Sequence, residues 1–245
     1  EKKRHEVLQL VRRTPRTVDE HRWDPQVHRI DPAILRDVDA VVNLSGVGVG
    51  DRRWSAKHKR AVLTSRLETT STLSRGLAAA ADEDPGRTRV LLNASAVGWY
   101  GDTGDRIVDE DAPAGQDFLA RVCTDWEAAT TPAVEAGVRV VTLRTGLVLG
   151  AGGLLARLLP IFRLGLGGRL GDGRQYMPWI SLDDEIGAIR FLLTSSIAGP
   201  VNLTAPNPVT NAEFTRALGR AVGRPAKLVV PGVALRVVLG EFADV

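Results

Sequence analysis

Residues 93–127 read NASAVGWYGDTGDRIVDEDAPAGQDFLARVCTDWE, and this stretch decides the fold class. It continues the apolar run Val90–Leu92, places the small hydroxyl residue Ser95 just past that run, and then turns polar and glycine-rich. Such a run predicts a buried strand that ends at a loop. A helix-period segment, Phe118–Ala136, begins before the stretch ends. Strand, loop and helix together predict one repeat of an α/β fold, with Ser95 at the carboxyl end of a strand.

Further strands and helices extend this pattern in both directions. The expected strands are Glu6–Val11, His21–Trp23, Ala40–Leu44, Arg89–Ala94 and Arg139–Leu143, and the expected helices are Ser55–Ala81 and Phe118–Ala136. The strands are continuous apolar runs, which is typical where helices cover both faces of a sheet. Ser55 is a suitable N-cap, because its hydroxyl can accept a bond from an unpaired backbone N–H. We therefore expect a Rossmann-like, doubly wound parallel sheet.

The character of the chain changes after Gly150. The glycine-rich passage Leu164–Gly173 leads into Tyr176–Leu182, and a helix is expected from Asp183. Another helix, Ala212–Val222, should be capped by Thr210 or Asn211. We expect residues 1–150 to form a dinucleotide-binding domain, and residues 151–245 to form a smaller substrate lobe that is interleaved with the end of the sheet and covers a ligand crevice.

The two ends of the chain carry their own expectations. No glycine-rich phosphate-binding turn precedes Glu6–Val11, and Gly46–Gly50 has the wrong spacing and follows a different strand. We therefore expect a first βα unit to be missing before residue 1, with Glu1–Arg4 as the tail of its helix. The end at Gly240–Val245 is expected to be cut inside a helix.

Composition narrows the class of protein. The formal net charge is only +3 and both signs are interspersed, so no basic stripe predicts nucleic-acid binding. No apolar run has the length of a membrane span. The single cysteine, Cys123, cannot form an internal disulfide, which favours a cytoplasmic location. The four histidines lack metal-ligand spacing, so no metal site is expected.

Two short segments are candidates for cofactor contact. Arg12 and Arg13 follow the first expected strand, where a dinucleotide fold meets the adenosine ribose. Guanidinium groups there match a 2′-phosphate and favour NADP over NAD. The alternative is a solvated basic strand end. Small residues in Asn43–Gly46 could let backbone pass close to a cofactor, although any tight exit from a strand looks similar.

Polar and aromatic side chains near the expected crevice leave alternatives open. Ser95 could hydrogen-bond a substrate carbonyl or hydroxyl, or could simply cap its strand. Asp125 and Glu127 are two apart on a helix and therefore face different sides, so we expect solvated carboxylates rather than a paired site. Trp99 and Trp179 could wall a pocket, although tryptophan more often packs in a core. Residues Asp102, Asp105, Asp109 and Glu110 are expected to form a polar loop.

A family resemblance emerges from motifs taken in order along the whole chain. They are Val42–Gly46, Arg53-Trp54, Ser65-Arg66, Ser95–Gly101, Phe118–Ala120 with Asp125–Glu127, Leu143–Gly150, Gly165–Gly168, Gly173–Gln175, Trp179–Asp184 and Val201–Asn211. In this order they resemble the nucleoside-diphosphate-sugar epimerase-like branch of the extended short-chain dehydrogenase/reductase superfamily, which has a C-terminal domain of unknown function. The resemblance implies an NAD(P)-binding domain and a small-molecule substrate, such as a nucleotide sugar.

The resemblance also implies which residues meet each ligand. Those expected at the cofactor are Arg12, Arg13, Asn43, Leu44, Ser45, Gly46, Ala94, Arg144 and Gly146. Those expected at the substrate are Trp99, Gln175 and Trp179, with Ser95 as the family's catalytic serine. Homodimerisation through the two long helices would be typical, although a monomer would contain the same helices.

One departure limits what the resemblance implies. Active members carry a Tyr-x-x-x-Lys pair on the helix after the serine, but residues 118–123 read FLARVC. General acid–base help is worth about 10²–10⁴-fold in rate, so ordinary alcohol–ketone chemistry needs another proton donor. Tyr100 is the nearest candidate in sequence, and Tyr176 is a second. Two hypotheses follow: an NADP-dependent oxidoreductase or epimerase with a displaced acid, and an NADP-binding sensor or interaction protein without redox turnover.

Overall fold

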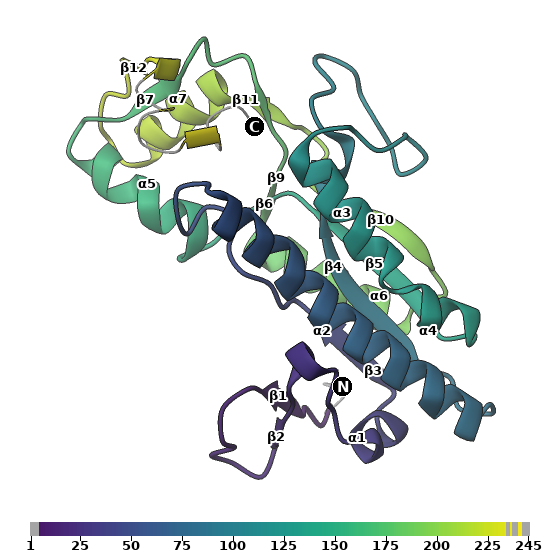
Figure 1. The fold of residues 1–245 in the computed structure, drawn as a ribbon. Coiled ribbons are helices and arrows are strands. Elements are labelled where there is room, and N and C mark those ends of the chain that lie inside the picture. Colours follow the sequence, from purple (N-terminus) through teal and green to yellow (C-terminus); the bar gives the residue numbers. More distant parts are fainter. Residues whose placement is uncertain (1–4, 234–235, 237–239, 242–245) are drawn as a thin grey trace.

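The structure is a computed structural model that describes residues 5–233, 236, 240 and 241. The expectation for Glu1–Arg4 therefore lies outside the described residues, as does most of the one for Gly240–Val245. The C-terminal lobe, described below, and the N-terminal strands lie at opposite ends of the molecule, with a sheet and its covering helices between them (Figure 1).

The centre of the fold is a four-stranded parallel sheet. Its strands are β3 (Ala40–Asn43), β4 (Val90–Ala96), β5 (Arg139–Thr145) and β10 (Gly199–Leu203), in the order β10-β5-β4-β3. All three pairings are parallel, and the register places Ser95 opposite Arg144. The predicted α/β class with a parallel sheet is confirmed.

Helices cover both faces of this sheet (Figure 1). They are α1 (Pro32–Asp37), α2 (Ala56–Glu83), α3 (Phe118–Ala128), α4 (Thr131–Glu135) and α6 (Leu182–Thr194). Leu91 packs with Leu77 of α2 in one core cluster, whereas its neighbour Leu92 packs with Leu192 of α6 in the other. Successive strand residues point to opposite faces. Burial on both sides explains why the strands are continuous apolar runs.

A first pair of short strands stands apart from the central sheet. The parallel strands β1 (Gln9–Val11) and β2 (Glu20–Arg22) form their own two-stranded sheet. As far as the described residues go, no ladder joins them to β3. Strand β1 is shorter than predicted, and β2 begins and ends one residue earlier than predicted, so that Trp23 lies outside it and packs in the core beside α2. Between them and α1 lies the short 3₁₀ helix η1 (Pro25–Val27).

The prediction of one helix over residues 118–136 was wrong, because this segment forms two helices. Helix α3 ends at Ala128, and α4 begins with Pro132 in its first turn. Pro132 has no N–H to bond the carbonyl of Ala128, and its ring would clash with that carbonyl in a continuous helix, so one helix ends at Ala128 and the next has the proline in its first turn. Ser74 of α2 secures the break, since its Oγ donates to Thr130 O at 3.0 Å and accepts from Ala133 N at 2.9 Å.

The C-terminal lobe is built from short strand pairs around two helices. Strand β6 (Leu147–Leu149) pairs with β9 (Trp179–Ser181), β7 (Gly168–Leu170) with β12 (Leu228–Val230), and β8 (Tyr176–Met177) with β11 (Val209–Thr210). The helices are α5 (Gly153–Arg163) and α7 (Asn211–Ala221). We use "C-terminal lobe" for α5, α7 and these six strands.

Two predicted helix starts are confirmed. Ser55 Oγ accepts from His58 N at 3.2 Å and caps α2. Thr210 caps α7 in a reciprocal capping box with Glu213, whose carboxylate reaches back to Thr210 N. No helix in the described part of the chain is both long and apolar enough to cross a membrane.

Candidate active site

Ser95 lies at the carboxyl end of β4, on the face of the sheet that α2 and α3 cover. The alternation of the strand puts it on the same side as Leu91, which packs against α2. Its side chain is buried, and its Oγ donates a hydrogen bond to Glu127 Oε1 of α3 at 2.6 Å. A hydroxyl bonded to a carboxylate at this distance forms a strong, charge-assisted hydrogen bond.

Glu127 is paired with Arg144 in a buried, two-pronged ion pair. Arg144 Nε donates to Glu127 Oε1 at 3.0 Å, and Arg144 Nη2 donates to Oε2 at 3.1 Å. The side chains are 3% and 12% exposed for Arg144 and Glu127, so the pair is shielded from water. Burial by itself lowers the pKa of Arg144, but hydrogen bonds with Glu127 and Tyr100 outweigh it and raise that pKa.

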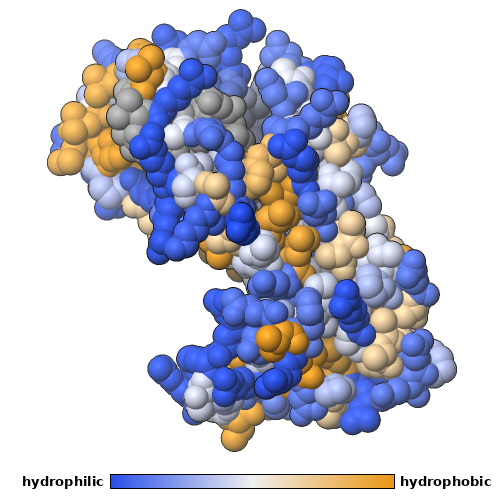
Figure 2. Space-filling model, viewed as in Figure 1, coloured by the Kyte–Doolittle hydropathy of each residue, from blue (hydrophilic) through white to orange (hydrophobic). Residues whose placement is uncertain are grey.

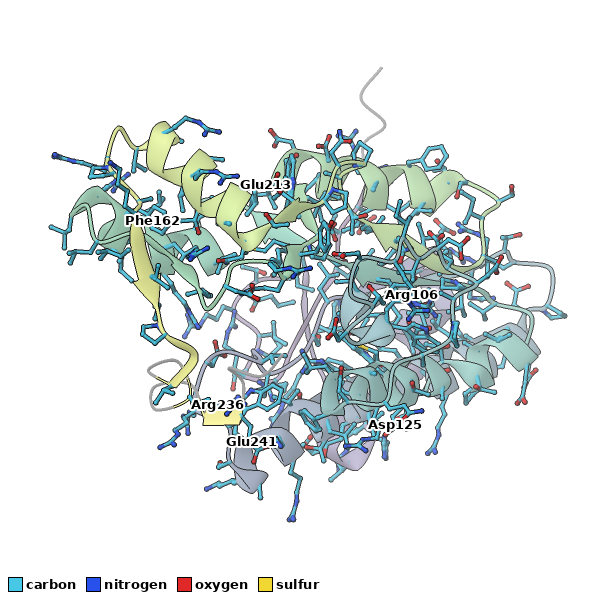
Figure 3. The ribbon with its side chains drawn as sticks, turned by 90° about the horizontal axis from the view of Figure 1, so that it is seen from above. Arg106, Asp125, Phe162, Glu213, Arg236 and Glu241 are labelled. Atoms are coloured by element: carbon cyan, nitrogen blue, oxygen red, sulfur yellow. The ribbon has the colours of Figure 1, made fainter. Side chains whose placement is uncertain are left out.

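The expectation that Glu127 is solvated was therefore wrong, while Asp125 is exposed as expected. The helix phase separates the two carboxylates, and Figure 3 labels Asp125 on α3. Glu127 faces β5, where Arg144 offers a buried partner that no pattern within the helix predicts. This difference makes Asp125 a natural control for Glu127.

Tyr100 joins the same group of side chains. It ends the 3₁₀ helix η2 (Val97–Tyr100), is 8% exposed, and donates from its hydroxyl to Asn202 Oδ1 of β10 at 2.7 Å. The same hydroxyl accepts from Arg144 Nη1 at 3.1 Å. We call Ser95, Tyr100, Glu127, Arg144 and Asn202 the carboxylate network. Both hydrogen-bonding roles of the Tyr100 hydroxyl are taken by protein groups.

Glu110 closes the network from the loop before α3. Its carboxylate accepts from Asn202 N at 2.7 Å, and its backbone oxygen accepts from Arg144 Nη1 at 3.1 Å. The polar loop expected here is present, but this residue is more than a solvated loop side chain. Trp99 lies flat against the network, with its ring centre 3.9 Å from the Arg144 guanidinium carbon.

The face of α3 that meets the end of β4 carries Leu119, Cys123 and Glu127, spaced four residues apart. A Cβ added at Gly98 of η2 would lie 3.4 Å from Leu119 Cβ and 3.8 Å from Cys123 Sγ. Burial, with a smaller effect from the Glu127 carboxylate, raises the pKa of the Cys123 thiol to about 11. This face therefore offers one apolar side chain, one neutral thiol and one carboxylate.

The segment after β3 is held by a buried amide cluster. Asn43 Nδ2 donates to Asn93 Oδ1 at 2.7 Å and to Thr70 Oγ1 at 3.0 Å, while Asn43 Oδ1 accepts from Ser45 N at 3.2 Å. Thr70 Oγ1 also accepts from Trp126 Nε1 of α3 at 2.9 Å. Asn43 thus links β3, β4 and α2 in the core, and the cluster fixes the carboxyl ends of both strands.

The remaining predicted cofactor residues lie around this edge. Leu44 is 61% exposed, Gly46 is exposed, and Ala94 and Ser45 are partly buried. Gly146 has no room for a side chain, because an added Cβ would lie 2.2 Å from Pro178 O. That glycine is required by the close approach of the chain before β9.

The two arginines after β1 differ in their surroundings. Arg13 donates to both carboxylate oxygens of Glu20 on β2, at 2.7 and 2.5 Å. The hydrogen bonds from Arg13, with a further one from Arg16 N, lower the pKa of Glu20 to about 2. Arg12 is exposed and makes no ion pair with any residue that the structure describes. A 2′-phosphate would therefore meet one uncommitted guanidinium here rather than two.

Of the predicted substrate residues, Trp99 lies in η2 beside the carboxylate network, whereas Gln175 and Trp179 lie in the C-terminal lobe. Trp179 borders a cavity of about 280 Å³ that is lined by apolar side chains of β6, α5 and α7 together with Glu213. Figure 3 labels Glu213 on α7 and Phe162 on α5. Gln175 is exposed and donates to Leu170 O at 3.2 Å. Tyr176, the second candidate acid, is 46% exposed in β8, with no contact to the carboxylate network described.

Figure 2 shows the molecule hollowed on one side, between the C-terminal lobe and the N-terminal strand pair. The sequence predicted Ser95, Tyr100 and Arg144 at a ligand site, and the structure joins them in one network. The prediction missed Glu127 and Asn202. The spacing of four residues between Cys123 and Glu127 is the signal that could have placed both on the same helix face.

Comparisons with known proteins show which family the chain resembles. The model of the "NAD dependent epimerase/dehydratase family" matches residues 1–203. Epimerase family protein Mb2239 of Mycobacterium bovis is 54% identical over 242 residues, which cover 98% of this chain and 78% of that protein.

Two solved structures are similar over nearly the whole chain. Human epimerase family protein SDR39U1 (isoform 2), crystallised with NADPH, has a TM-score of 0.82 and 33% identity, covering 96% of this chain and 78% of that one. The nucleoside-diphosphate sugar epimerase of Corynebacterium glutamicum has a TM-score of 0.76 and 36% identity, covering 95% of this chain and 49% of that one.

Proposed function

Because the chain belongs to the NAD dependent epimerase/dehydratase family, we propose that it binds NADP and acts on a small carbonyl compound or nucleotide sugar beside Ser95. The uncommitted guanidinium of Arg12 fits a 2′-phosphate. NADPH in the crystals of the human relative supports the same preference. The name of the Corynebacterium relative supports a nucleotide sugar as the substrate class.

One observation carries the proposal: Ser95, Glu127 and Arg144 are connected where two adjacent parallel strands end. Ligands of open α/β sheets bind outside the carboxyl ends of the strands. Ser95 Oγ can accept the proton of a substrate hydroxyl while its own proton passes to Glu127 Oε1, 2.6 Å away. In the reverse direction the same path returns a proton to a carbonyl oxygen. A bound nicotinamide supplies or accepts the hydride of such a reaction.

Arg144 and Tyr100 act in this proposal as positioning residues. The two hydrogen bonds from Arg144 hold both oxygens of Glu127, so one of them stays directed at Ser95. Tyr100 holds Arg144 from its other side and is itself held by Asn202. Its proton is already donated within the protein, so the Ser95–Glu127 pair is the better candidate for proton transfer.

The test compares binding and turnover in the full-length protein. NADPH should raise the melting temperature more than NADH does, and oxidation of NADPH should be followed by absorbance with a panel of carbonyl compounds and sugar nucleotides. Ser95→Ala and Glu127→Gln should each reduce turnover about a hundredfold or more, while NADPH affinity changes little. Asp125→Asn, which removes an exposed carboxylate from the same helix, is the matched control. Absence of stabilisation by either cofactor would contradict the proposal.

A second candidate function is NADP binding without redox turnover, as in a sensor or an interaction protein. It is favoured by the same hydrogen bonds, because the Ser95 hydroxyl already donates to Glu127, and the Tyr100 hydroxyl both donates to Asn202 and accepts from Arg144. Stabilisation by NADPH without turnover of any panel compound would favour this function. In that case Ser95→Ala would leave the effect of NADPH on the melting temperature unchanged.

A further inference from the structure

Arg66 of α2 lies between the segment after β3 and helix α3. Its Nη1 donates to Val47 O and to Val62 O, both at 2.9 Å. Its guanidinium carbon is 4.8 Å from the ring centre of Trp126. It also lies close to Gly46, where an added Cβ would be 3.1 Å from that carbon. The guanidinium therefore contacts both an indole and a glycine at the carboxyl-end edge of the sheet.

This guanidinium has no counter-charge among the residues that the structure describes. No carboxylate there lies within ion-pair distance, and only Nη1 has hydrogen-bond acceptors, so Nε and Nη2 remain without one. Arg144, by contrast, is paired with Glu127. Burial lowers the pKa of Arg66. A mostly buried charge is costly unless it is paired, which indicates that its partner is supplied from outside this part of the chain.

We infer that Arg66 binds a phosphate group of the ligand at the carboxyl-end edge of the sheet. The inference rests on the proposed function, which places cofactor and substrate at this edge. Adjacent Nε and Nη2 donors match the spacing of two phosphate oxygens, and a planar, preoriented guanidinium loses little freedom on binding. Arg66 adjoins Gly46 at the end of the Asn43–Gly46 segment. The phosphate could belong to the dinucleotide or to a nucleotide-sugar diphosphate.

The alternative role for Arg66 is to hold the loop after β3 in place, and a variant of Ser65 is the control for that role. Ser65 Oγ accepts from Val47 N at 3.0 Å, while Arg66 Nη1 holds Val47 O, so two neighbouring side chains hold one loop residue. Ser65→Ala loosens the loop without removing a charge. Arg66→Met keeps an unbranched side chain against Trp126 and removes every N–H, and Arg66→Lys keeps the charge without the fork.

The experiment measures dissociation constants by calorimetry for NADPH and, separately, for UDP as the probe of a substrate diphosphate. If the phosphate is the cofactor's, Arg66→Met should weaken NADPH about tenfold or more and leave UDP unchanged, because a hydrogen bond to a charged group is lost. If it is the substrate's, the loss should fall on UDP alone. Arg66→Lys should recover part of the affinity, and the salt dependence of binding should be shallower in Arg66→Met.

Two outcomes would overturn this inference and leave the proposed function standing. One is a wild type that binds NADPH or UDP while Arg66→Met binds both within twofold of wild type. The other is an equal loss in Arg66→Met and Ser65→Ala with a similar drop in melting temperature, which assigns Arg66 to loop holding. A wild type that binds neither probe overturns the proposed function together with this inference.

Discussion

Removing the Glu127 carboxylate should destabilise the fold strongly, because it leaves Arg144 charged and buried. In Glu127→Ala the guanidinium loses two hydrogen bonds at 3.0 and 3.1 Å, and Ser95 loses its acceptor at 2.6 Å. Breaking a buried ion pair from one side costs about 3–5 kcal/mol. Against a total stability of about 5–15 kcal/mol for a domain, that is a large fraction.

Urea unfolding followed by circular dichroism measures this cost, provided that the slope with denaturant stays constant. Asp125→Ala is the control, since that exposed carboxylate is expected to change the free energy of unfolding by less than about 0.5 kcal/mol. The double variant Glu127→Ala/Arg144→Met should lose less than the two single changes summed, because the remaining group is no longer an unpaired charge.

The reasoning would be refuted if Glu127→Ala cost less than about 1 kcal/mol, the value of a solvent-exposed pair. Strict additivity in the double variant would also refute it. Either result would mean that water reaches the Arg144 guanidinium, contrary to its 3% exposure.

Three further predictions follow from other parts of the structure. Glu20 has a pKa lowered from 4.5 to about 2 by Arg13, so the stability from this pair is present above pH 4.5 and is lost as the pH falls through 2; acid unfolding of Glu20→Gln should lack that component. Cys123, buried with a thiol pKa of about 11, should react with a thiol reagent at pH 8 much more slowly in the folded than in the urea-unfolded protein. Gly146→Ala should lower the melting temperature by about 4 °C or more, because its Cβ would lie 2.2 Å from Pro178 O, whereas Gly152→Ala, with nothing within 4 Å, should shift it far less.

The parts of the fold that were predictable depend on local signals. The strands β3, β4 and β5 are apolar runs buried on both faces, and their boundaries differ from the expected ones by only a few residues. The caps at Ser55 and Thr210 use hydrogen bonds within one turn of helix. Pro132 is a readable signal for the break between α3 and α4, but the prediction of one helix followed the helix period alone.

The parts that were not predictable depend on contacts between distant segments. The periodicity of α3 correctly places Asp125 and Glu127 on different sides of the helix. That Arg144 lies opposite Ser95 follows only from the register between β4 and β5. Arg13 was predicted to bind a 2′-phosphate because the sequence at the end of a strand does not show that Arg13 pairs with Glu20 of the neighbouring strand. Arg66 belonged to a family motif, but its missing counter-charge is visible only once α2, α3 and the loop after β3 are packed together.

Strand β10 has a consequence for the order in which the chain can fold. It is contributed by residues that follow most of the C-terminal lobe, and it pairs Gly199 with Val141 along the outer edge of β5. During synthesis this edge of β5 stays unpaired until the segment through Leu203 has been made. Until then the backbone groups of β5 on that side have no strand partner. Asn202 arrives with the same strand. Tyr100 therefore has this acceptor only once β10 has joined the sheet, so we expect the edge that holds the carboxylate network to be completed late in folding.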